Sequence, residues 1–133
     1  MKPRVVLDTN VLVSGLLGGT ATEVIRRWRA EAFRLILSEE ILAEYEAVLR
    51  RPKFKLPSWV VQELLGNIRG NAEWVEPAAE LAIELRDPAD AKFLRAAVDG
   101  GADMVVTEDK DLLDLKEFQS IRLVPSWESL TLL

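Results

Sequence analysis

Acidic side chains follow two apolar runs that have the character of buried strands. The run 5–7 leads into Asp8, and the run 104–106 leads into Thr107, Glu108 and Asp109. Ligands of open α/β sheets bind beyond the carboxyl ends of the strands, so parallel strands here would bring Asp8 and Asp109 to one edge. Each acid could instead be the N-cap of a following helix. Two such acids, each beside a hydroxyl or amide neighbour, favour a function over two caps.

Two further aspartates stand at the start of a predicted helix over 87–100. Asp87 followed by Pro88 has a structural explanation, because Asp favours the N-cap and Pro the first helical position. At 100° per residue, Asp90 points near the centre of the apolar face of that helix. A carboxylate aimed at the core is costly unless it is paired or bound to a cation, although one at a helix start can also stay partly hydrated. We therefore expect a function for Asp90 and a cap for Asp87.

A fourth candidate acid, Glu44, lies on a predicted helix that Ser38 opens. Glu39 and Glu46 point away from the apolar stripe of this helix, whereas Glu44 lies at its edge. Taken alone, Glu44 is best interpreted as a rim glutamate that pairs with Lys or Arg. Glu44 becomes a candidate site residue only if it lies beside the other three acids.

Four carboxylates cannot converge without neutralisation, because repulsion would protonate some of them. The chain has neither cysteine nor histidine, which excludes thiolate and imidazole ligands and histidine general bases. Oxygen-only ligands match Mg²⁺ or Mn²⁺, ions that activate water and stabilise a phosphoryl transition state. The candidate site residues are thus Asp8, Glu44, Asp90 and Asp109.

The net charge of −5 argues against a domain held on nucleic acid by bulk charge. Two local basic clusters partly offset this: Arg26, Arg27, Arg29 and Arg34 in one, Arg50, Arg51, Lys53 and Lys55 in the other. Such clusters are more often solvated faces than binding sites. The four tryptophans are expected to pack in cores or interfaces. No run resembles a signal peptide or a membrane span, so a cytoplasmic protein is expected.

The 133 residues suit one domain with a self-sufficient core. Strands are expected at 5–7, 33–37, 72–75, 104–106 and 122–124. Helices are expected over 20–29, with Thr20 and Glu23 as a capping box, and over 38–50, 57–70 and 87–100. The segment 78–85 stays ambiguous. This alternation predicts an α/β domain with a parallel sheet covered on both faces.

At this point the chain resembles a PIN-domain ribonuclease. The resemblance rests on the opening segment 5–14, on Glu44, on the segment 87–94 and on the segment 102–113. These motifs span most of the chain in the order and spacing of a minimal domain. Within the family, the chain looks most like the bacterial and archaeal toxin subunits of toxin–antitoxin pairs.

The resemblance implies a single PIN-like (5′-nuclease-like) domain over 1–133, an α/β/α sandwich with a central, mainly parallel sheet. It also implies an Mg²⁺- or Mn²⁺-dependent endoribonuclease that acts on RNA, forms homodimers and is inhibited by a small antitoxin protein. Asp8, Glu44, Asp90 and Asp109 match the family's acids, with Asp8, Asp90 and Asp109 as metal ligands. Asn10 and Thr107 match polar residues that support the acids, and Asp111 matches an accessory acid. One departure is Leu112, where the family usually has an aromatic residue.

Three other functions would also place an acid after the first strand or at helix ends. A haloacid dehalogenase-type phosphatase also begins with a strand and an Asp, but needs a second Asp where this chain has Asn10. A response-regulator receiver would need an Asp after a strand near 50–60, where Pro52 and Pro57 stand instead. A catalytically silent interaction module would use the acids only as caps and rim charges, and would not bind Mn²⁺ through Asp8 and Asp109.

Overall fold

The computed structural model describes residues 1–78, 80–81 and 84–133. In this part of the chain six strands form one sheet in the order β3-β2-β1-β4-β6-β5. The strands are β1 (Arg4–Leu7), β2 (Arg34–Leu37), β3 (Glu73–Trp74), β4 (Met104–Val106), β5 (Glu117–Phe118) and β6 (Ile121–Val124). All neighbours pair in parallel except β5 and β6, which form an antiparallel hairpin. The predicted parallel sheet is confirmed.

The central strands are buried on both faces, as their continuous apolar runs predict. Val5, Val6 and Leu7 of β1 are completely buried, and so are Val105 and Val106 of β4. Strands that alternate between polar and apolar residues could not be covered twice in this way. The core of the protein therefore lies on both sides of β1 and its neighbours.

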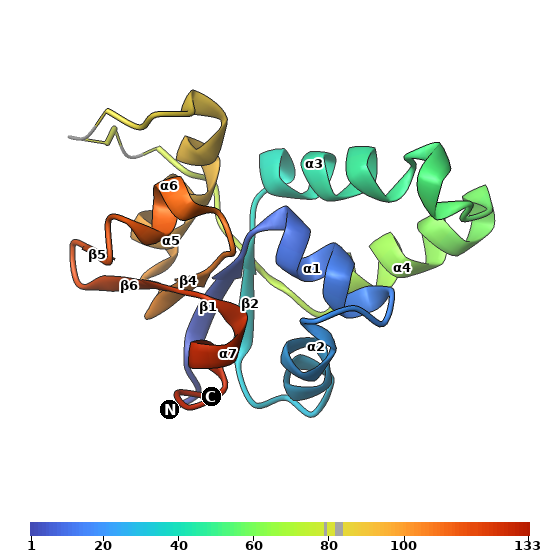
Figure 1. Cartoon of the computed structure of the whole chain (residues 1–133), viewed down its shortest axis with the longest axis horizontal. Coiled ribbons are helices and arrows are strands. Elements are labelled where there is room, and N and C mark those ends of the chain that lie inside the picture. The colour runs from blue at the N-terminus through green and yellow to red at the C-terminus, as the bar shows by residue number, and fades with distance from the viewer. Residues whose placement is uncertain (79, 82–83) are drawn as a thin grey trace.

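Helices cover the two faces of the sheet (Figure 1). On one face α5 (Ala91–Gly100) packs on β1, β2 and β4. A Cβ atom on Gly100 would lie 2.8 Å from the side chain of Ile36, so a glycine permits this close approach. On the other face lie α1 (Thr9–Leu16) and α2 (Thr22–Arg29), which pack on each other. The arrangement is the α/β/α sandwich that was expected.

A helical arm leaves the sheet at the carboxyl end of β2. It consists of α3 (Glu39–Leu49), the short 3-10 helix η1 (Pro52–Phe54) and α4 (Ser58–Gly70), and it extends to one side of the molecule (Figure 1). The hydroxyl of Ser38 accepts a hydrogen bond from the Ile41 amide at 3.2 Å, so Ser38 caps α3 as predicted. The arm places the middle of α3 above the carboxyl edge of the sheet.

Short elements complete the carboxyl half. The 3-10 helix η2 (Pro88–Asp90) precedes α5, and Gly101 ends α5 in the left-handed conformation (φ 62°) that glycine adopts readily. The helix α6 (Lys110–Leu113) follows β4, and α7 (Ser126–Ser129) follows β6. The strand expected at 122–124 is β6, and α6 is the helix that the alternative interpretation of Asp109 as an N-cap allowed, whereas β5 and α7 were not predicted.

The structure corrects one predicted cap and leaves one segment untested. Helix α2 begins at Thr22 after Ala21, which cannot cap with its side chain, so the expected capping box of Thr20 and Glu23 is wrong. The Thr20 hydroxyl lies 3.4 Å from that of Ser14, and the Thr22 hydroxyl donates to the Gly19 carbonyl at 2.6 Å. In the ambiguous segment 78–85, residues 79 and 82–83 lie outside the described residues, and the others form neither helix nor strand.

The tryptophans divide between core and surface. Trp28 is buried in the core, as expected, whereas the side chains of Trp59 and Trp127 are 68% and 70% exposed. Trp74, at the edge strand β3, is partly exposed and packs under the guanidinium of Arg69. None of the helices in the described part of the chain is long and apolar enough to span a membrane.

Candidate active site

The carboxyl ends of β1 and β4 form the base of the site. Leu7 pairs with Val106 in parallel register, and the Asp8 amide donates to the Val106 carbonyl at 3.0 Å. The next amide along β4, that of Thr107, donates to the Val124 carbonyl at 3.0 Å. The residues that follow both strands therefore leave the sheet at the same edge, as the sequence predicts for parallel strands.

The Asp8 side chain bonds to Thr107 and does not cap the helix that follows it. Asp8 occupies the N-cap position of α1 without a side-chain capping bond. Its carboxylate instead accepts a hydrogen bond from the Thr107 hydroxyl at 2.6 Å. The same hydroxyl accepts a hydrogen bond from the Asp109 amide at 3.0 Å. One fully buried threonine thus fixes Asp8 and the backbone of Asp109 relative to each other.

The charge on Asp8 is poorly compensated. Burial raises the pKa of its carboxyl, and the nearby carboxylates of Glu44 and Asp109 raise it further. The hydrogen bond from Thr107 and one from the backbone act in the opposite direction and do not overcome the burial. A positive charge at this point would relieve both burial and repulsion.

The two aspartates of the segment 87–90 have separate roles. Asp87 accepts a hydrogen bond from the Ala89 amide at 3.0 Å and caps η2, as expected. Asp90 makes no capping bond and is only 8% exposed. Burial, together with the charges of Asp109, Asp87 and Asp8, raises the pKa of Asp90 to about 7. Asp109 is the largest electrostatic cause of this shift, because repulsion between two neighbouring carboxylates favours the protonated form.

Asp109 and Asp111 lie at the start of α6. Asp109 accepts a hydrogen bond from the Asp111 amide at 2.9 Å, so it caps α6 and also approaches Asp90. Asp111, the expected accessory acid, is held by Arg86 at 2.9 Å, and the same guanidinium lies 3.6 Å from Asp114. Asp111 is thus part of an exposed charge network at the outer rim of the site.

Glu44 reaches the site from α3, and both of its oxygens are engaged. Lys92 of α5 donates to one oxygen at 2.6 Å, and the Thr9 hydroxyl donates to the other. The interpretation of Glu44 as a glutamate that pairs with a lysine is confirmed, and Glu44 is also close enough to raise the pKa of Asp8. The acids predicted from the sequence therefore come together from β1, α3, η2 and the end of β4.

Sequence reasoning did not find three polar partners: Lys92, Thr9 and Tyr45. The Tyr45 hydroxyl, which is fully buried, donates to the Leu7 carbonyl at 2.6 Å and anchors α3 to the end of β1. Burial and the charges of Asp8 and Glu44 raise its pKa well above the usual value, so this hydroxyl stays protonated. Lys92 lies inside the motif 87–94, but its partner is 48 residues away along the chain. Asn10, an expected supporting residue, is exposed on the first turn of α1.

The donor set fits a hard divalent cation in its chemistry. Asp8, Asp90 and Asp109 supply only carboxylate oxygens, which suit Mg²⁺ or Mn²⁺. As the side chains stand, no group of three acidic residues in the described ranges is arranged to hold an ion. Asp8 is turned toward Thr107, and Asp109 toward the Asp111 amide. The raised pKa values of Asp8 and Asp90 indicate where an ion would be stabilised.

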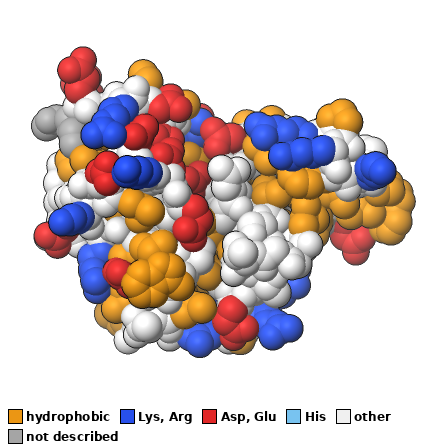
Figure 2. Space-filling model, viewed as in Figure 1, with side chains coloured by type: hydrophobic (Ala, Val, Ile, Leu, Met, Phe, Trp, Pro, Cys, Tyr) orange, Lys and Arg blue, Asp and Glu red, His pale blue; other side chains and the backbone are white. Residues whose placement is uncertain are grey.

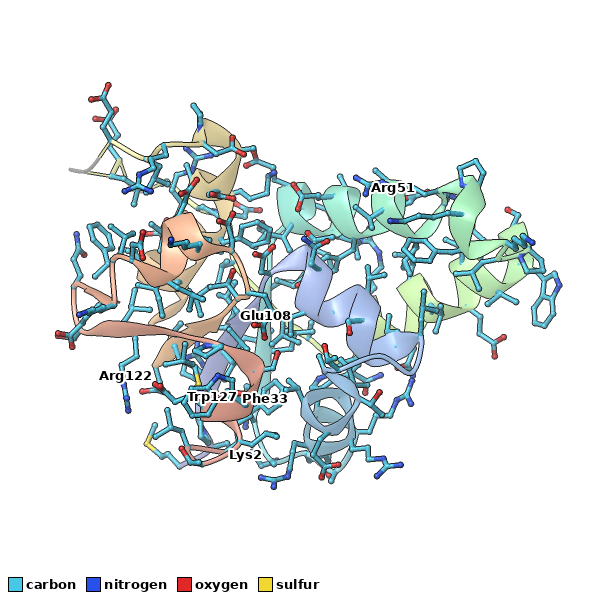
Figure 3. The ribbon with its side chains drawn as sticks, viewed as in Figure 1. Lys2, Phe33, Arg51, Glu108, Arg122 and Trp127 are labelled. Atoms are coloured by element: carbon cyan, nitrogen blue, oxygen red, sulfur yellow. The ribbon has the colours of Figure 1, made fainter. Side chains whose placement is uncertain are left out.

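The surface around the site is acidic, and a cavity lies elsewhere. Figure 2 shows acidic side chains gathered at the top centre of the visible face, whereas Lys and Arg cover the upper side of the arm. Arg51 marks this basic region at the end of α3 (Figure 3). A cavity of about 480 Å³ is lined by Lys2, Phe33 and Arg34, among others. These residues precede or begin β1 and β2, so the cavity lies at the amino edge, opposite the acids.

Comparisons with known proteins agree with this architecture. No curated protein matches the chain. Among solved structures, the chain is similar to one described as VapBC2 from Rickettsia felis bound to a DNA fragment from their promoter, with a TM-score of 0.59 and 17% identity over 90% of this chain and 96% of that one. At this identity the likeness concerns the fold. Residues 4–111 match the PIN domain family, whose members are generally nucleases. The chain belongs to the PIN domain family.

Proposed function

We propose that this protein is an Mg²⁺- or Mn²⁺-dependent endoribonuclease that acts as the toxin of a toxin–antitoxin pair. The observation that carries the proposal is the location of Asp8, Asp90 and Asp109 at the carboxyl edge of the sheet, where burial first, and then neighbouring carboxylates, raise the pKa of Asp8 and of Asp90. Membership of a family that consists mainly of nucleases supports a hydrolytic reaction on a nucleic acid.

Asp8, Asp90 and Asp109 are the residues that would hold the ion. When bound, Mg²⁺ or Mn²⁺ supplies Lewis acidity and lowers the pKa of coordinated water, which replaces the missing general base. Thr107 orients the carboxylate of Asp8 and, through the Asp109 amide, the start of α6. Tyr45 stays protonated and holds the Leu7 carbonyl, so its role is to position the end of β1.

The net charge of −5 requires that RNA reach the acids along a locally basic path. The cluster of Arg50, Arg51, Lys53 and Lys55 lies at the far end of α3 and in η1, on the arm that begins beside the site (Figure 3). Arg50 is paired with Glu46 at 2.8 Å, and Lys53 lies 5.0 Å above the ring of Phe54. Arg51 is exposed. These cations are the proposed entry for the RNA backbone.

A small antitoxin and a second copy of the chain are the proposed protein partners. The similar solved structure is a VapBC2 complex, which supports a paired partner for this chain. The exposed Trp59 on α4 and Trp127 on α7 are large apolar groups at the surface, of the kind enriched in interfaces. If the antitoxin covers one of these tryptophans and the second copy of the chain covers the other, both are buried in the complete complex.

RNA cleavage by the purified protein tests the proposal. Structured and unstructured RNA are incubated with wild type and with the D8N variant, in Mn²⁺, in Mg²⁺ and in EDTA. We expect cleavage by wild type with either ion, and none in EDTA or with D8N. E39Q is the matched control, because Glu39 is an exposed acid on α3 that pairs with Arg69 at 3.3 Å. Undiminished cleavage in EDTA, or by D8N, would contradict the proposal.

A further inference from the structure

The four acids of the site differ in how their charges are compensated. Glu44 has a lysine and a hydroxyl on its two oxygens. Neither Asp8, Asp90 nor Asp109 forms an ion pair in the described part of the chain. The three aspartates therefore have no cationic partner among the described residues, whereas Glu44 has one.

The Lys92–Glu44 pair is more enclosed than the other ion pairs around the site. The side chain of Lys92 is 12% exposed and that of Glu44 is 30% exposed, against 70% and 39% for Arg86 and Asp111. Holding a lysine at this depth costs desolvation and side-chain entropy, which a surface pair avoids. The contact joins α3 of the arm to α5, two residues beyond Asp90. The Lys92–Glu44 pair therefore lies close enough to Asp90 to take part in substrate binding at the site.

Lys92 has donors to spare. An ammonium group has three N–H donors, and one of them is used on Glu44. A phosphodiester that approaches the three aspartates brings negative charge to a region that holds an excess of it. Among the cations of the described residues, Lys92 is the one bonded to an acid of the candidate set.

We propose that Lys92 binds a phosphate of the substrate and that Glu44 is its positioning residue, outside the ligand set of the metal ion. Glu44 fixes the lysine at the rim of the site, and Thr9 donates to the second oxygen of Glu44, so both oxygens of this carboxylate already have partners. This inference rests on the proposed function. It assigns Glu44 a task that differs from that of the three aspartates.

Two kinds of measurement separate these tasks. Mn²⁺ affinity, measured by titration with Mn²⁺ alone, reports the ligand set. The steady-state KM and kcat for RNA report phosphate binding. The variants are E44Q, K92M, K92R and the double variant E44Q/K92M, with D8N as the metal-site reference and E39Q as the matched control on the same helix. Melting temperatures show that each variant is folded.

Loss of a ligand in D8N should raise the Kd for Mn²⁺ at least about tenfold, whereas E44Q and K92M should change it by less than about threefold. K92M should raise KM about tenfold, as expected for a lost charged hydrogen bond. K92R keeps a positive charge and should raise KM much less. E44Q should also raise KM, and the double variant should be no worse than K92M, because Glu44 acts through Lys92.

Two results would overturn the inference. An Mn²⁺ affinity of E44Q as weak as that of D8N would make Glu44 a metal ligand. A KM of K92M equal to that of wild type, with only the melting temperature lowered, would make the pair purely structural. Failure of the wild type to cleave RNA is a different outcome, which refutes the proposed function. The Mn²⁺ titrations still decide the place of Glu44 in that case.

Discussion

Replacing Asp90 with asparagine should stabilise the metal-free protein at alkaline pH. The pKa of Asp90 is raised from 3.8 to about 7, mainly by burial and then by Asp109, Asp87 and Asp8. Between these two values the folded protein keeps a proton that the unfolded chain has released. The free energy of unfolding therefore falls as the pH rises through this window. Asparagine keeps the shape of the side chain but cannot ionise, so the variant escapes this loss.

The size of the effect follows from the shift. About three pKa units correspond to an upper limit of about 4 kcal/mol. The carboxyl lies at the open edge of the sheet, where solvent screens part of the repulsion, so we expect about 1–2 kcal/mol. For a chain of this length the gain corresponds to an increase in Tm of about 3–8 °C.

The assay is a thermal melt of wild type and D90N in EDTA at about pH 5 and about pH 8, on either side of the Asp90 titration. The chain has no histidine, so no ordinary imidazole titrates between these points. D90N should melt above wild type at the higher pH, with a smaller difference at the lower one, and E39Q should show no such trend. Mn²⁺ should raise the Tm of wild type but not of D90N. A D90N protein that melts no higher than wild type at alkaline pH would refute the reasoning.

Four other substitutions or measurements test the site. D87A should lower the free energy of unfolding by about 1 kcal/mol and leave Mn²⁺ affinity unchanged, because Asp87 is a cap; a lost affinity would contradict this role. Y45F should cost about 1–2 kcal/mol in urea unfolding, because the Leu7 carbonyl loses its buried donor; an unchanged midpoint would argue against the anchor. T107V should raise the pKa of Asp8 and move the onset of Mn²⁺ binding to higher pH, because the carboxylate loses its hydroxyl donor; an unchanged onset would argue against this role. Product ends, read by mass spectrometry, should be 5′-phosphate and 3′-hydroxyl, since water is the nucleophile, whereas 2′,3′-cyclic phosphates would exclude it.

The sheet and its carboxyl edge could be predicted because strands buried on both faces have continuous apolar sequences. The runs 5–7 and 104–106 are apolar without alternation, as strands covered on both faces must be. Their parallel pairing brings Asp8 and the segment after Val106 to one edge. The cap at Asp87 was also predictable, because an N-cap depends only on residues that are neighbours in the sequence.

The remaining features depend on contacts between distant segments. The two-residue strand β5 exists only through its pairing with β6, and no periodicity can mark so short an element. Helix α2 begins at Thr22 and not at Thr20, whose hydroxyl lies 3.4 Å from that of Ser14, a contact with another segment that the Thr20–Glu23 pattern does not contain. The partners of Glu44 come from α1 and α5, so Lys92 could be recognised only after the helices were placed.

The central claim is that Asp8, Asp90 and Asp109 together hold a divalent cation. Anomalous diffraction from crystals grown with Mn²⁺ tests it most directly, since the signal identifies the ion and places it among the side chains. We expect a peak in coordination contact with all three carboxylates, and Glu44 still bonded to Lys92. No peak at this edge in a crystal that diffracts well, or a peak held by other residues, would contradict it.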